Sequence, residues 1–211
     1  MSGRIENRRG AAAFAVWLIL QLIALGNCTY RVRLWARAPA AVEQSALVVM
    51  LAVQIATSSM LFPYLLSSGR LAILSLVTAW PLGQLAACLS DASFGALLCG
   101  EAYVCVWLAA LFLLTRTLRN DASRRLAVAI ATLFCLGGPV LFYLRMDFGN
   151  DPQFTPQHGI ALFGPVMGAV SQTFPNRPIV PWTTPILFLI AAALARWHAR
   201  AQKQSSRQII H

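Results

Sequence analysis

The chain has 211 residues, of which 58% are hydrophobic and 11% charged, and its formal net charge is +10. Soluble domains are about half apolar and about one quarter charged, so this composition argues against an ordinary soluble domain. The basic residues are mostly arginines at the ends of apolar runs. They do not form a folded basic patch with stacking aromatic residues, so the charge argues against nucleic-acid binding and indicates membrane topology.

Six apolar runs are close to the length of a membrane span, which needs roughly 20 mostly apolar residues. Six such spans leave no room for a separate soluble domain. We therefore predict an all-α polytopic membrane protein with six transmembrane helices, forming one domain over residues 1–211. The predicted spans are Ala11–Gly26, Ser45–Leu66, Leu71–Leu89, Phe94–Thr115, Leu126–Leu144 and Thr183–Leu194.

The first predicted span follows a polar, basic segment at residues 1–10. A basic start before an apolar run is also typical of a secretory signal peptide. The sequence before Cys28 faintly resembles a lipoprotein cleavage site, but Asn27 stands where such a site requires a small residue. We therefore favour a retained helix over a cleaved signal.

The fourth predicted span contains the sharpest candidate for a functional residue, Glu101. It lies about seven residues, or roughly 10 Å, into the span. A carboxylate at that depth is costly unless it faces the protein interior, pairs with another group or is protonated. Glu101 could therefore contact an ion, a proton or a substrate. Alternatively, it forms a structural pair with Arg145, which follows the fifth predicted span, or is a neutral hydrogen-bonded acid.

Helix-breaking residues interrupt two of the predicted spans. Pro81 lies in the third, and Gly137, Gly138 and Pro139 lie in the fifth. Proline removes a backbone donor and clashes with the preceding turn, so we predict kinks at these positions. Broken helices can line a transport site, although Gly and Pro are also commoner in membrane helices than in soluble ones.

The outer connection between the last two spans, residues 145–182, is long and rich in proline. Within it, Gly159–Val170 is apolar but too short to cross the membrane, which predicts a short re-entrant or interfacial helix. Asp147, Asp151 and His158 also lie here, but their spacing fits no defined metal loop. We therefore predict no metal site and no cofactor. The chain also contains no serine-hydrolase, zinc-protease or phosphate-loop motif, so we assign no catalytic residue.

The distribution of Lys and Arg predicts the orientation of the six spans. With the N-terminus inside, five basic residues fall in outer segments: Arg31, Arg33, Arg37, Arg145 and Arg177. Twelve fall in inner segments: Arg4, Arg8, Arg9, Arg70, Arg116, Arg119, Arg124, Arg125, Arg196, Arg200, Lys203 and Arg207. This bias places both termini, including the basic tail at residues 196–211, in the cytoplasm. We predict a bacterial-type inner membrane as the location, and the preference for Arg over Lys favours a GC-rich genome.

The last third of the chain resembles the membrane subunit of a type-two ABC exporter. The matching features are Gly138-Pro139, the segment Phe163–Val170, and a final span with a basic end at Arg196–Arg207. The resemblance implies a dimeric permease driven by a separate ATPase chain. Members of that family usually carry a substantial charged segment between spans two and three that contacts the ATPase. Here that connection is only Ser67–Arg70, which departs from the family pattern.

These observations predict a non-enzymatic integral membrane subunit, either a permease-like transport component or an anchoring component of a larger complex. Its expected partners are the lipid bilayer, other membrane subunits or a second copy of the chain, and a separate ATPase chain, with no nucleic acid. The alternative is an integral membrane enzyme that acts on a lipid or another membrane-soluble substrate, using Glu101 or the outer connection.

Overall fold

The structure of the protein is a computed structural model that describes residues 2–34, 45–90, 92–118, 120–148, 164–173 and 182–208. The described residues form helices joined by short turns, and none of them belongs to a strand. The helices are α1 (Ser2–Leu34), α2 (Ser45–Leu65), α3 (Gly69–Leu89), α4 (Phe94–Thr117), α5 (Asp121–Phe148), α7 (Gly164–Ser171) and α8 (Thr183–Gln208). The prediction of an all-α chain is confirmed.

Four of these helices contain stretches that are long and apolar enough to cross a membrane. The stretches are Arg8–Thr29, Ala46–Leu65, Gly69–Leu89 and Phe94–Thr117. The second, third and fourth predicted spans therefore match α2, α3 and α4 to within two residues at either end. α8 contributes a shorter apolar stretch, Thr183–Trp197, and continues as the predicted basic helix end to Gln208.

Short connections and serine caps fix α2, α3 and α4 as consecutive antiparallel neighbours. The Ser68 hydroxyl accepts a hydrogen bond from the Leu71 backbone N–H at the start of α3, and Ser93 does the same for Ala96 at the start of α4. Each cap satisfies one of the backbone donors that the first turn of a helix leaves without a partner. The chain thus reverses direction within a few residues at each of these two connections.

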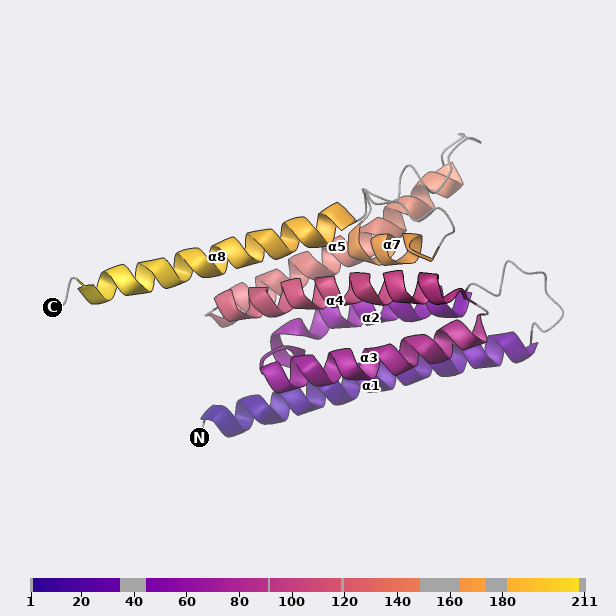
Figure 1. Cartoon of the computed structure of the whole chain (residues 1–211), viewed down its shortest axis with the longest axis horizontal. Coiled ribbons are helices and arrows are strands. Elements are labelled where there is room, and N and C mark those ends of the chain that lie inside the picture. The colour runs from indigo at the N-terminus through magenta and orange to yellow at the C-terminus, as the bar shows by residue number, and fades with distance from the viewer. Residues whose placement is uncertain are drawn as a thin grey trace.

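α2 is the central helix of the bundle. It packs against α1, α3, α4, α5 and α7, whereas α8 packs mainly on α4 (Figure 1). The start of α1, the α2–α3 turn, the α4–α5 connection and the end of α8 all lie at the same end of the bundle, on the left of Figure 1. The elements that carry the predicted inner arginines are therefore gathered at one end.

α1 packs on α2 and α3 through a single stripe of its surface. The stripe has helical spacing of three and four residues and consists of Gly10, Ala13, Trp17, Gln21, Ala24 and Cys28, all of which are buried. The large apolar residues on its other faces are exposed, among them Ile19 and Ile23. This one-sided packing is what a peripheral span with a lipid-facing surface requires, because its remaining faces would be covered by lipid.

α7 overlaps the short apolar helix predicted at Gly159–Val170 over residues 164–170. The first five residues of that prediction lie outside the described part of the chain. Val166 and Ala169 are buried, and the helix packs against α2, α4 and α5. It begins at Gly164, whose φ is +83° and whose Cα lies too close to the Phe134 carbonyl oxygen for a side chain to fit. Glycine is therefore required where α7 starts on the side of α5.

The predicted helix-breaking residues do not divide their helices. α3 continues through Pro81, and α5 is a single helix from Asp121 to Phe148 that includes Gly137, Gly138 and Pro139. These residues therefore do not end their helices, and the kinks expected at them stay a prediction. A proline removes one intrahelical hydrogen bond, and the rest of a long helix in an apolar environment still satisfies its own backbone groups.

Candidate functional site

The middle of the apolar helix α2 carries four buried polar residues that point to different sides of the helix. They are Gln54, Thr57, Ser58 and Ser59, which we call the α2 polar cluster. In a membrane interior no water is present to satisfy such groups, so each needs a partner inside the protein. The α2 polar cluster contacts four neighbouring helices, α1, α3, α4 and α5, and its partners define the candidate site.

Two members of the α2 polar cluster bind α1. The indole Nε1 of Trp17 donates a hydrogen bond to the Ser58 hydroxyl at 3.2 Å. One helical turn away, the Gln21 amide Nε2 donates to the Thr57 hydroxyl at 3.0 Å. Trp17 and Gln21 are both fully buried. These side chains fix the rotation of α1 about its own axis, because other rotations would leave their donors in lipid.

Ser59 joins α2 to both α4 and α5. Its hydroxyl accepts hydrogen bonds from Trp107 Nε1 at 2.9 Å and from the Cys135 thiol at 3.1 Å. The same hydroxyl donates to the Ile55 carbonyl oxygen one turn earlier in α2, at 2.7 Å. One hydroxyl group therefore uses its donor and both acceptor positions. The Ser59 hydroxyl is therefore a shared hydrogen-bonding centre for three helices, α2, α4 and α5.

Glu101 lies where α4 meets α2 and α3, and only 1% of its surface is exposed. Its carboxyl group packs directly against the Cα of Gly83 in α3, where a β-carbon would overlap the carboxyl oxygen. The Gln54 side chain of α2 interacts with the same carboxyl group. Gln54 also donates from Nε2 to the Ala79 carbonyl oxygen, at 3.2 Å, one turn before Gly83 in α3. The expectation that Glu101 faces the protein interior is confirmed.

The centre of the bundle also contains buried oxygen atoms with unused hydrogen-bonding capacity. Within the described part of the chain, Glu101 Oε1, Gln54 Oε1 and Gln21 Oε1 have no hydrogen-bond partner. Leaving a buried acceptor without a donor is unfavourable, and for a carboxylate the cost is larger. Two of these oxygens belong to the interacting pair Glu101 and Gln54. This pair can therefore accept a proton, a water molecule or a small cation.

The proposed pairing of Glu101 with Arg145 is not tested, because the Arg145 side chain lies outside the described residues. Its backbone belongs to the last turns of α5, which lie at the end of the bundle where α4 begins (Figure 1). Asp151 and His158 also lie outside the described residues. Where side chains are described, no group of three or more His, Cys, Asp or Glu residues could hold a metal ion.

Glu101 could be identified from the sequence, but the α2 polar cluster was missed. The signal was present as the run Thr57-Ser58-Ser59 with Gln54 one turn earlier, inside an apolar span. In a membrane helix, Ser and Thr can hydrogen-bond to backbone carbonyl groups of their own helix. Their presence in a span therefore does not by itself predict a contact with another helix. Only the neighbouring helices show that these residues bind Trp17, Gln21 and Trp107. No protein-family model, curated protein or solved structure matches the chain.

Proposed function

We propose that this chain is a permease-like, non-enzymatic membrane subunit with six spans, in which Glu101 binds a proton or a small cation during transport. The observation that supports this role is a buried carboxyl group without a basic partner among the described side chains and with an unpartnered oxygen. Acidic residues buried in membrane spans commonly belong to ion pathways or proton relays. A purely structural acid would be expected to have its oxygens satisfied.

In the six-span topology, α5 and α8 cross the membrane in addition to the four long apolar helices. Both helices lie along the bundle, and both expose large apolar residues such as Leu133 and Leu187. Exposed apolar side chains are expected on surfaces that face lipid. In this topology both termini lie in the cytoplasm and the membrane is the inner membrane of a bacterium. The expected partners remain other membrane subunits, a second copy or a separate ATPase chain.

The proposal is tested by ion flux in proteoliposomes that contain the purified protein. A potassium diffusion potential set with valinomycin drives cations, and dyes inside the vesicles report protons or sodium ions. We expect flux above that of empty liposomes for the wild type, and flux at the empty-liposome level for Glu101→Gln. The Gln variant nearly preserves size and hydrogen bonding but cannot ionise.

The matched control is Glu6→Gln, which removes an acidic residue from α1 ahead of its apolar stretch Arg8–Thr29. Glu6→Gln should retain the wild-type flux. Equal flux in wild type and Glu101→Gln, or no flux above empty liposomes, would contradict the ion-binding role. A stable complex with other membrane proteins in mild detergent would then favour an anchoring subunit.

A further inference from the structure

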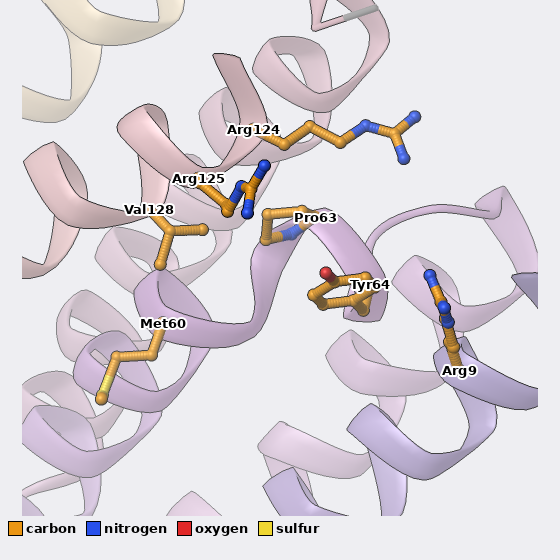
Figure 2. Close-up of a pocket in the computed structure, with 7 residues that line it drawn as sticks. All are labelled: Arg9, Met60, Pro63, Tyr64, Arg124, Arg125 and Val128. Carbon is orange, nitrogen blue, oxygen red and sulfur yellow. The ribbon is translucent and has the colours of Figure 1, made fainter. Parts of the chain in front are cut away.

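A second polar feature lies away from Glu101, at the end of the bundle where α1 begins. A pocket of about 340 Å³ is lined by Arg9 of α1, by Arg124, Arg125 and Val128 of α5, and by Met60, Pro63 and Tyr64 of α2. We call it the arginine pocket. Figure 2 shows the arginines extending from two different helices around the end of α2.

The arginine pocket concentrates positive charge around a concave surface. Three guanidinium groups line it, and among the described residues no acidic side chain does. Guanidinium groups bind phosphate through paired hydrogen bonds and a full positive charge. Because a water molecule occupies about 30 Å³ in the liquid, the pocket is larger than a single phosphate ion requires. Its size and charge therefore fit a phosphate group together with part of the molecule that carries it.

The position of the pocket indicates which phosphate-bearing molecule it binds. Arg9 and Tyr64 lie one residue inside the ends of the apolar stretches Arg8–Thr29 and Ala46–Leu65. Arg124 and Arg125 directly precede the apolar part of α5. All of these residues therefore lie where the apolar spans end, which is the level of lipid headgroups.

The lining of the pocket is partly basic and partly apolar. Besides the arginines, it contains the apolar side chains of Met60, Pro63 and Val128. Met60 has 49% of its surface exposed, so part of this apolar lining is open to the surroundings. A free phosphate ion gains nothing from apolar contacts, whereas a phospholipid presents a phosphate directly above its acyl chains. Basic pockets between spanning helices are known to bind anionic headgroups.

We propose that the arginine pocket binds the phosphate-bearing headgroup of an anionic phospholipid, with the guanidinium groups on the phosphate and the acyl chains along Met60 and Val128. This site is separate from Glu101 and does not depend on ion transport. It would anchor α5 to α1 and α2 through the lipid, at an end of the bundle where α5 carries two adjacent like charges.

The test is native mass spectrometry of the full chain in mild detergent, titrated with phosphatidylglycerol or with phosphatidylcholine. The wild type should retain phosphatidylglycerol in preference to phosphatidylcholine. Replacing Arg9, Arg124 and Arg125 together by Gln should weaken phosphatidylglycerol binding about 100-fold, the effect expected for three basic residues at an anionic surface. The control replaces Arg70, Arg116 and Arg196 by Gln. Arg70 lies at the start of α3, Arg116 at the end of α4, and Arg196 in the middle of α8, where its apolar stretch Thr183–Trp197 ends. None of the three lines the pocket.

A second variant leaves the charge unchanged in case the arginine variant folds poorly. Val128→Trp fills the pocket from its apolar side and should also weaken phosphatidylglycerol binding at least tenfold. Equal losses in the pocket and control arginine variants would overturn the proposal, because general surface charge would then explain the binding. Unchanged binding in Val128→Trp would also overturn it. Displacement of the lipid by inorganic phosphate at comparable concentration would instead assign the pocket to a soluble phosphate compound.

Discussion

The carboxyl group of Glu101 packs against the Cα of Gly83. Glu101 is the only acidic side chain described in the bundle interior, and glycine is the residue without a β-carbon that would overlap its carboxyl group. The contact joins α4 to α3, while Gln54 of α2 interacts with the same carboxyl group. Position 83 therefore determines whether three helices can close around Glu101. The arrangement couples a packing requirement to the candidate ion-binding group.

Gly83→Ala should destabilise the protein by about 1–3 kcal/mol, the usual cost of overpacking a well-packed interior. The added methyl group would overlap the Glu101 carboxyl group, which has no exposed space into which it can move. Glu101→Ala removes that overlap, so the double variant should regain part of the loss. Unfolding in mild detergent, arranged as a double-mutant cycle, measures the coupling.

The control for this cycle is Gly69→Ala at the start of α3, where no atom lies within 4 Å of an added β-carbon. Its effect should be close to zero, and combining it with Glu101→Ala should be additive. If Gly83→Ala is as mild as Gly69→Ala, the close packing of α3 on Glu101 is wrong.

Ser59→Ala should cost more stability than Ser58→Ala. The first change leaves both Trp107 Nε1 and the Cys135 thiol without an acceptor, whereas the second affects Trp17 alone. Interhelical hydrogen bonds in membranes average about 0.6 kcal/mol, and a buried donor left unsatisfied costs about 1–3 kcal/mol. We therefore expect a loss of about 1–2 kcal/mol for Ser59→Ala. Unfolding in mild detergent provides the measurement, with the exposed Ser67→Ala as the control. Equal effects at positions 59 and 67 would argue against the shared centre.

Two glycines of the α5–α7 region should respond to alanine with opposite signs. Gly164→Ala should destabilise the protein by about 1–3 kcal/mol, because its φ of +83° is unfavourable for a side chain and the Phe134 carbonyl blocks the space. Gly137 lies inside α5 with no atom within 4 Å of an added β-carbon, so alanine there should stabilise the helix by up to about 1 kcal/mol. Thermal unfolding of the two variants tests this contrast. A stabilising Gly164→Ala would contradict the described start of α7.

Reporter fusions test the proposed six-span orientation. Fusions after Arg70, Asn120 and His211 should report the cytoplasmic side, and fusions after Ala40 and His158 the opposite side. The reason is that the basic ends of α1, α3, α5 and α8 lie at one end of the bundle, and positive charge is retained on the cytoplasmic side. A C-terminus on the outer side would rule out six spans with this orientation.

The lengths of the apolar runs in the sequence were enough to predict where α2, α3 and α4 begin and end. α2, α3 and α4 begin and end within two residues of their predicted limits, because bilayer thickness sets the length of a span and serine caps mark the turns. The depth of Glu101 also followed from counting residues from the start of its helix. These properties depend on residues that are close together in the sequence.

Only the tertiary structure decided which face of each helix points inward. In a soluble helix the apolar stripe marks the buried face, but in a membrane span the lipid-facing side is apolar as well. Hydropathy therefore could not reveal that Ser59 binds Trp107, or that Gly83 receives the Glu101 carboxyl group. Nor could it show that Arg9 and Arg124, which are 115 positions apart, line one pocket. These relationships depend on how each helix is rotated and which neighbours it meets, and that is set by contacts between distant segments.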